Sequence, residues 1–332
     1  MNTHLNKKAG SRRKFLEQLA LIGVALPWLP SSLKAAPAGI LHKKSTPRID
    51  SISVFSKHLQ FLNYDDSARV AAEIGFDGLD LTVRPEGHVL PENVETDLPK
   101  AVEAARKAGI NVPTITTSIT SVTDPFAEKI LATASGLGIR HYRMGWVEYD
   151  HSRSLLDNLD NLVSRFRSLA QMNKKYGIVG DYQNHAGAHM GSPVWDIFRV
   201  LESLDPEWIG SQYDIRHASC EGGNCWPLGL ELIHNYIHTV VVKDFYWKNI
   251  NGKWREFDTP VGEGMVNFQA YFDQLKKLGV SAAMIMHFEY PLSNKPDSML
   301  PVADTIAQVK ANMKKDLETV RGLIAAAGIE YK

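Results

Sequence analysis

Residues 49–83 read IDSISVFSKHLQFLNYDDSARVAAEIGFDGLDLTV, and they show the unit from which this chain is built. A short run rich in β-branched residues, Ile49–Phe55, is followed by a helical pattern over Asp65–Ile74 that ends at Gly75. A second strand is then predicted at Gly78–Val83. A strand, a helix and another strand in this order indicate two parallel strands joined by a crossover helix.

The same alternation continues along the chain. Six further strands are predicted at Asn111–Thr117, Ile139–Val147, Ile178–Gln183, Ile209–Ile215, Thr239–Phe245 and Ala282–Glu289. Further helices are predicted at Leu98–Ala108, Pro125–Leu137, Leu155–Tyr176, Pro193–Leu204, Pro227–Tyr236, Phe268–Leu278 and Val302–Ala327. Eight strand–helix units in about 280 residues predict an α/β fold with a single (β/α)8 TIM barrel. The alternative is a doubly wound sheet, but no glycine-rich phosphate loop follows the first strand.

Composition narrows the class of protein. The 332 residues include 37 Lys and Arg against 37 Asp and Glu, and 44% are hydrophobic, as in a globular chain. A balanced charge argues against nucleic acid as a partner, because binding phosphates requires a basic surplus or stripe. Two cysteines cannot form a disulfide framework or a thiolate zinc site. Cys220 and Cys225 bracket a short loop, and both a bridge and free thiols remain open.

The amino terminus resembles an export signal. Ser11–Leu16 reads SRRKFL, a twin-arginine motif, and the apolar stretch Leu19–Leu29 is too short to span a bilayer. Small residues at Ala36 and Ala38 predict cleavage after Ala38, so residues 1–38 are a signal peptide and residues 39–332 the barrel. A basic amphipathic helix or a retained anchor is the alternative.

Cleavage at this point changes the expected charge and location. Residues 1–38 hold six basic residues and one acidic residue, so the mature chain has 31 basic and 36 acidic residues. We therefore expect a mildly acidic periplasmic protein that meets the twin-arginine export machinery and has no stable membrane anchor. The oligomeric state is left open.

Polar residues follow the predicted strands at the end where active sites of such barrels lie. They are Glu148 after the fourth strand, Asp181, Gln183 and His185 at the fifth, Asp214, Arg216 and His217 at the sixth, Lys243 at the seventh, and His287 and Glu289 at the eighth. Arg84 and His88 follow the second strand. Burying such groups together without a purpose is costly, so their convergence predicts a functional site.

The order of these residues resembles a known family. The carriers are Gly75–Asp80, Asp214 with His217, Lys243-Asp244 and Gly262-Glu263-Gly264. Over roughly Arg48–Tyr290 the chain resembles the xylose-isomerase-like barrels, also described as sugar phosphate isomerases and epimerases, and within them an exported subgroup. Members bind one divalent metal through Glu, Asp, His and Glu from strands five to eight. The metal holds two oxygens of a hydroxy-carbonyl substrate while carboxylates move a proton between adjacent carbons.

Carried onto this sequence, that metal site is altered. The first Glu falls on Gln183, the Asp on Asp214, the His on Val241 and the last Glu on His287 or Glu289. One interpretation keeps a divalent Mn, Mg or Zn ion on Gln183, Asp214 and either Glu289 or His287, with Glu148 as a further ligand. The other places the Lys243 ammonium where the cation would be, to stabilise an enediolate oxyanion.

The resemblance implies an exported carbohydrate-active isomerase, epimerase or lyase that abstracts a proton next to a carbonyl. We expect Glu289 or His287 as base and Lys243 as the stabilising charge. The residues expected to bind substrate are His185, Arg216, His217, Glu148, His88 and Arg84. The expected partner is a small carbohydrate, and elimination or hydrolysis of a 3-keto-glycoside is the preferred variant. The alternative is a non-catalytic sugar-binding barrel. A DNA endonuclease on a related barrel is disfavoured by the acidic mature charge.

Overall fold

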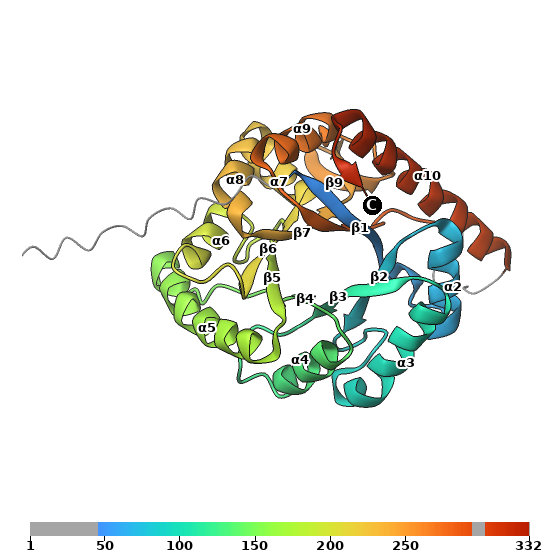
Figure 1. Ribbon diagram of the computed structural model, residues 1–332. Helices are drawn as coiled ribbons and strands as arrows, with labels where there is room; N and C mark the ends of the chain where they lie inside the picture. Colours follow the sequence, from blue (N-terminus) through green and yellow to red (C-terminus); the bar gives the residue numbers. More distant parts are fainter. Residues whose placement is uncertain (1–45, 294–302, 332) are drawn as a thin grey trace, which may run out of the picture. The chain divides into compact units, whose positions relative to one another are not determined.

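A computed structural model of the protein describes residues 46–293 and 303–331. Eight parallel strands form a closed barrel with helices around it, which confirms the predicted TIM barrel (Figure 1). In spatial order the strands are β1 (Arg48–Phe55), β2 (Gly78–Val83), β3 (Asn111–Thr117), β4 (His141–Arg143), β5 (Val179–Gln183), β6 (Ile209–Asp214), β7 (Ile237–Val242) and β10 (Ala282–Met286). Pairing of β10 with β1 closes the barrel. The predicted signal, residues 1–38, lies outside the described residues.

Helices follow the barrel strands and form the outer ring. They are α2 (Tyr64–Ile74), α3 (Val94–Lys107), α4 (Ala127–Gly136), α5 (Leu155–Tyr176), α6 (Val194–Leu201), α7 (Ile215–Gly222), α8 (Trp226–Ile233), α9 (Phe268–Leu278) and α10 (Ala303–Ala327). Short 3-10 turns occur at η1 (Ser56–Leu59), η2 (Pro91–Asn93), η3 (Gly223–Cys225) and η4 (His234–Tyr236). Helix α2 is capped at its amino end by Asn63, whose side chain accepts the Asp66 N–H, and at its carboxyl end by Gly75 with φ 107°. In the described part of the chain, the helices all lack the length or the apolar character needed to cross a membrane.

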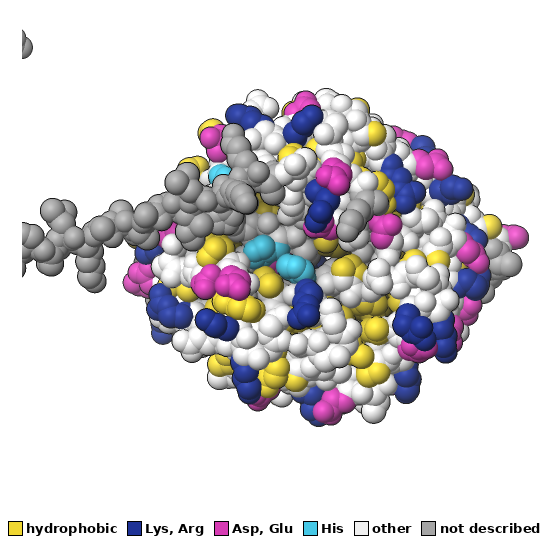
Figure 2. Space-filling model, viewed as in Figure 1, with side chains coloured by type: hydrophobic (Ala, Val, Ile, Leu, Met, Phe, Trp, Pro, Cys, Tyr) yellow, Lys and Arg dark blue, Asp and Glu magenta, His cyan; other side chains and the backbone are white. Residues whose placement is uncertain are grey.

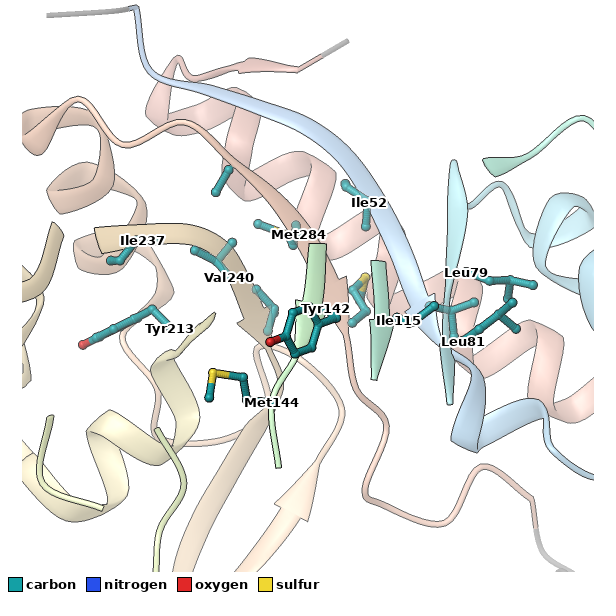
Figure 3. Close-up of a cluster of buried hydrophobic side chains, with 14 of the residues drawn as sticks. Ile52, Leu79, Leu81, Ile115, Tyr142, Met144, Tyr213, Ile237, Val240 and Met284 are labelled. Carbon is teal, nitrogen blue, oxygen red and sulfur yellow. The ribbon is translucent and has the colours of Figure 1, made fainter. Parts of the chain in front are cut away.

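The apolar core lies between the barrel and the helices. Figure 3 shows its side chains from several strands: Ile52, Leu79, Leu81, Ile115, Tyr142, Met144, Tyr213, Ile237, Val240 and Met284. Each buried aliphatic side chain of this kind stabilises the fold by about 1.5–3 kcal/mol. Because strand side chains alternate, the intervening residues point into the barrel, and many of these are polar. A separate small cluster of Phe55, Val241 and Ile285 is the apolar part of that interior.

Three predicted strands extend too far, and a hairpin was not predicted; one of the three, Ala282–Glu289, ends as β10 at Met286. The strand expected at Ile139–Val147 pairs only over β4, and the strand expected at Thr239–Phe245 ends as β7 at Val242. Residues beyond it form an antiparallel hairpin outside the barrel, β8 (Asp244–Ile250) and β9 (Lys253–Thr259). Its turn is Asn251-Gly252, both at positive φ, which is the signature of a tight primed turn. After β4, the apolar residues Met144, Trp146 and Val147 hid where the ladder ends, whereas β7 is followed directly by the charged pair Lys243-Asp244.

Asp244 anchors this hairpin to the loop Gly262-Glu263-Gly264. Its Oδ1 accepts the N–H groups of Phe245 at 2.8 Å and Val266 at 3.1 Å, and its Oδ2 accepts those of Gly262 at 3.0 Å and Gly264 at 2.9 Å. A Cβ at Gly264 would collide with the same carboxylate, so glycine is required there. The Lys-Asp and Gly-Glu-Gly motifs are thus one structural unit.

The surface and the ends of the described chain complete the fold. Figure 2 shows one end of the barrel, where histidine side chains lie near the centre and charges of both signs are interspersed around them. The described chain ends in a two-residue strand, β11 (Glu330–Tyr331), which pairs with the beginning of β1. This strand was not predicted. Cys220 and Cys225 are free thiols, which decides between the two alternatives left open by the sequence.

Candidate active site

A cavity of about 320 Å³ opens at the carboxyl end of the barrel, and we call it the mouth cavity. The residues that sequence analysis placed in the site and that line it are Arg84, Gln183, His185, Arg216, His217, Lys243, His287 and Glu289. Asp214 lies directly against them and is fully buried. Residues from β2, β5, β6, β7 and β10 or the loops just after them therefore converge, as expected for a TIM-barrel site. A cavity of this size is at the lower end of the range for small-molecule sites.

Asp214 is the centre of a buried polar network. Its Oδ2 accepts from Lys243 Nζ at 3.1 Å and from Gln183 Nε2 at 2.8 Å, and its Oδ1 accepts the backbone N–H of His217 at 3.2 Å. Gln183 Oε1 in turn accepts from Arg143 Nη1 at 2.9 Å. Burial raises the pKa of Asp214, and the Lys243 charge opposes that rise. An ammonium is thereby fixed at the wall of the mouth cavity.

These residues do not fit a divalent cation. Gln183 directs its NH2 group, not its oxygen, at Asp214, and the ammonium of Lys243 lies against the Asp214 carboxylate. Val241, at the position of the family's histidine ligand, is buried in the apolar cluster. Glu289, the remaining predicted ligand, pairs with Lys57 at 2.8 Å. A metal at this point would face Lys243 at close range, so the predicted set of Gln183, Asp214 and Glu289 is not a metal site in this arrangement.

Three neutral imidazoles surround the ammonium. Burial, followed by the charge of Lys243, lowers the pKa of His287 and of His217 well below the usual value, and lowers the pKa of His185 to about 3. Both ring nitrogens of His287 are buried and have no hydrogen-bond partner among the described residues, and the same is true of His217 Nε2. Buried polar atoms are ordinarily paired, so orphaned nitrogens at a cavity wall indicate a place for a ligand.

The tautomer of His217 follows from its neighbour. Arg216 Nη1 lies 3.2 Å from His217 Nδ1, and arginine can only donate. Nδ1 therefore accepts, and Nε2 carries the hydrogen; Nε2 is buried and lies 3.7 Å from Asp214 Oδ2. Arg216 itself is paired with Asp258 of the hairpin at 3.0 Å. The hairpin thus supplies one wall of the site.

The structure does not bring three of the predicted residues, Asp181, Glu148 and His88, to the mouth cavity, and Asp181 is described below with its two histidine partners. Glu148 is exposed and lies outside the lining. His88 is held beneath its own loop, with Nε2 at 3.1 Å from the carbonyl of Leu62 and its carbonyl accepting from Tyr64. Both follow predicted strands, but the loops that carry them turn away from the cavity.

Sequence analysis missed several lining residues. They are Phe55, Lys57, Arg143, Glu256 and Asp258. Arg143 was hidden because the fourth strand was predicted to run past it, although it is the residue at which β4 ends. Glu256 and Asp258 lie on β9, and the Asn251-Gly252 turn is the signal that would have revealed them.

At the opposite end of the barrel, three side chains form a group that could bind a metal ion. His141 Nδ1 lies 3.1 Å from one oxygen of Asp181, and His238 Nδ1 lies 2.7 Å from the other. The possible ligand atoms of His141, Asp181 and His238 all lie within 4.8 Å of one another, and among the described residues this is the group close enough to share one ion. His141 and His238 also line a second cavity, of about 550 Å³, at the amino ends of the strands.

Comparison with known proteins agrees with this architecture. The family described as xylose isomerase-like TIM barrel matches residues 68–314. No curated protein sequence matches the chain. The fold is similar to that of 3-keto-D-glucoside 4-epimerase from E. coli in its apo form, with TM-score 0.61, 16% identity and coverage of 82% of this chain and 99% of that one.

Two further solved structures share the fold. L-ribulose 3-epimerase has TM-score 0.63 at 14% identity and covers 84% of this chain and 96% of its own. The probable 3-DHS dehydratase from Bacillus anthracis has TM-score 0.60 at 12% identity and covers 82% and 98%. At these identities the likeness concerns the fold.

Proposed function

This chain belongs to the xylose isomerase-like TIM barrel family, and we propose that it is a sugar isomerase or epimerase-like enzyme that uses an ammonium in place of the family's metal. The observation that carries the proposal is the fixed Lys243 ammonium beside imidazole nitrogens that have no partner in the described chain. The names of the structural neighbours, two sugar epimerases and a dehydratase, support it.

The proposed reaction begins with removal of a proton from a carbon next to a carbonyl. Neutral His287 accepts that proton, and the electron pair of the broken C–H bond moves onto the carbonyl oxygen as an enolate. Lys243 stabilises the oxyanion by charge, which is worth most in a site that excludes water. Glu289, 3.8 Å from His287 Nδ1, stabilises the imidazolium that forms.

The fate of the enolate decides the product. His217 is neutral, so its Nε2–H acts as a hydrogen-bond donor to a substrate oxygen, and the proton that returns to carbon is the one held by the His287 imidazolium or one from water. A proton returned to the opposite face gives an epimer, and one returned to the adjacent carbon gives an isomer. Loss of a β-oxygen leaving group gives elimination. We propose elimination of a 3-keto-glycoside as the finer assignment.

The experiment follows hydrogen exchange, because every one of these outcomes shares its first step. The protein is incubated in D2O with a methyl 3-keto-glucoside and, separately, with D-fructose, and deuterium uptake beside the carbonyl is measured by NMR. His287→Asn should abolish the uptake, whereas His151→Asn, at an exposed histidine outside the cavity, should not. Sugar-dependent stabilisation without exchange by the wild type would instead make the protein a binding barrel.

The lowered pKa of His287 gives a prediction for how activity depends on pH. Because burial keeps its pKa well below 6.5, the base form is fully present at neutral pH. We expect kcat/KM to be flat from about pH 6 to 8 and to fall only at lower pH, as the imidazole gains a proton. The profile is measured with the substrate identified by exchange. An inflection near pH 6.5 would show that the base is an ordinary exposed histidine.

We further propose that a divalent ion, if the protein carries one, is held by His141, Asp181 and His238. Two imidazole nitrogens and a carboxylate suit Zn more than Mn or Mg. Zinc should then raise the melting temperature of the wild type and not that of Asp181→Asn, each compared with its own metal-free value. Equal shifts in both proteins would place the ion elsewhere. Elemental analysis of protein purified without chelator gives the stoichiometry.

We also propose that the protein works in the periplasm, supported by the twin-arginine motif at Ser11–Leu16. Cleavage after Ala38 should yield a mature chain that begins at Gly39. Amino-terminal sequencing of the periplasmic protein checks this. Replacing Arg12 and Arg13 by lysine should retain the precursor inside the cell, and unchanged export would contradict the assignment.

A further inference from the structure

Two arginines at the mouth cavity share one aromatic ring. Arg84 follows β2 and Arg143 ends β4, and their guanidinium carbons lie 5.7 and 5.4 Å from the centre of the Phe55 ring. Arg143 is only 4% exposed, and its Nε has no hydrogen-bond partner among the described residues. Two like charges therefore line one cavity and act on each other, and an anion bound between them would lower that repulsion.

The other cations of this cavity each have a carboxylate of their own. Within the described chain, Lys57 pairs with Glu289 at 2.8 Å, Arg216 with Asp258 at 3.0 Å and Lys243 with Asp214 at 3.1 Å. Arg84 and Arg143 form no such pair with any described residue.

Asp80 is the buried carboxylate whose charge acts on both arginines. Its oxygens accept from the Thr116 hydroxyl at 2.8 and 3.0 Å and form no hydrogen bond with either guanidinium. Burial raises the pKa of Asp80 to about 6, against the attraction of Arg143 and Arg84. The arginine pair therefore keeps hydrogen-bond donors that the described residues leave unused.

We propose that Arg84 and Arg143 bind a carboxylate group of the substrate, so that the substrate class is an acidic monosaccharide. A guanidinium presents donors in a planar fork that matches a carboxylate. His287 stacks on the same Phe55 ring, with centroids 4.4 Å apart and planes at 18°. The anion would therefore place the sugar ring beside the base. The anion site itself does not depend on the proposed function; only the identity of the carbon that reacts rests on it.

The surroundings suit one sugar ring. Trp146 lines the cavity and is 40% exposed; its ring lies 5.2 Å from the Arg143 guanidinium and 4.2 Å from the His185 ring, and its exposed part adds apolar surface beside which a pyranose can lie. The volume of about 320 Å³ matches a monosaccharide more closely than a longer chain.

The test compares ligands that differ only at one carbon. Dissociation constants of D-glucuronate, D-glucose and D-glucose 6-phosphate are measured by calorimetry at low ionic strength. Glucuronate should bind at least about tenfold more tightly than glucose, as expected for a charge-assisted bidentate contact. Arg84→Gln should bring that ratio close to one. Arg69→Gln, which removes an exposed cation that lies outside the cavity and already pairs with Asp66 and Glu73, is the matched control and should retain the preference.

Three results would overturn the carboxylate assignment: equal affinity of the wild type for glucuronate and glucose, a preference that survives Arg84→Gln, or tighter Arg84-dependent binding of the phosphate. Circular dichroism confirms that each variant is folded. The deuterium-exchange experiment separates this inference from the proposed function. Arg84-dependent binding of glucuronate without exchange on any sugar would leave the anion site standing and remove the enzyme. Deuterium exchange on a neutral 3-keto-glucoside, together with equal affinities for glucuronate and glucose, would support the enzyme and rule out the anion site.

Discussion

Replacing Lys243 by methionine should lower kcat by roughly 10²–10³-fold, because the substitution removes the charge that faces the developing oxyanion. The barrel should remain folded, since the pKa of Asp214 is already raised by burial and the carboxylate can take up a proton once the ammonium is gone. Single-turnover kinetics and thermal unfolding measure the two effects separately.

A double variant makes this prediction sharper. In Lys243→Met combined with Asp214→Asn, the buried charges are removed together, so no unpaired carboxylate is left at this point of the interior. We expect its thermal stability to lie closer to that of the wild type than that of the single variant does, while its turnover stays low. Recovery of turnover in the double variant would mean that Lys243 acts only as a structural partner of Asp214.

Replacing Asp244 by alanine should lower the free energy of unfolding by about 3 kcal/mol or more. Four backbone N–H groups lose their acceptor at a residue that is 1% exposed, and a buried donor without a partner costs about 1–3 kcal/mol. The unfolding free energy of Asp244→Asn should lie between those of the wild type and Asp244→Ala. The amide oxygen can accept from two of the four N–H groups, whereas the NH2 group faces the other two and cannot accept from them. Urea denaturation measures the series.

Asp244→Ala should also raise KM, because the hairpin that Asp244 anchors carries Asp258, the ion-pair partner of Arg216. Asp258→Asn is the matched control: it weakens that ion pair and leaves the Asp244 contacts intact. It should change KM with little change in stability. A normal unfolding free energy for Asp244→Ala would show that water replaces the carboxylate in the loop.

The barrel could be predicted from the sequence because its signal is repeated eight times. Apolar strands and amphipathic helices alternate at a regular spacing, and an error of a few residues in one unit leaves the others unchanged. The end of a strand is a weaker signal. Met144 and Val147 continue the apolar run after β4 has ended, so Arg143 falls in the middle of the predicted strand.

Part of the lining of the mouth cavity could be predicted from the sequence, but the hydrogen bonds and ion pairs among its residues could not. Polar residues at strand ends identified Lys243, Asp214 and His287, since a TIM barrel brings those ends together. Which way an amide is turned, or which carboxylate an ammonium pairs with, depends on contacts between strands far apart in the sequence. In the sequence alone, Gln183 occupies the position of a metal ligand. Only its hydrogen bonds to Arg143 and Asp214 show that it has a different role.

The hairpin β8–β9 has an evolutionary consequence. It contributes a wall of the mouth cavity through Glu256 and Asp258, yet it pairs with no strand of the described barrel. Mutations along it beyond Asp244 can therefore accumulate without disturbing the register of the eight strands. Lineages that descend from one such ancestor could diverge in the sugars they accept while inheriting the same chemistry, with selection acting on one short and contiguous stretch of the gene.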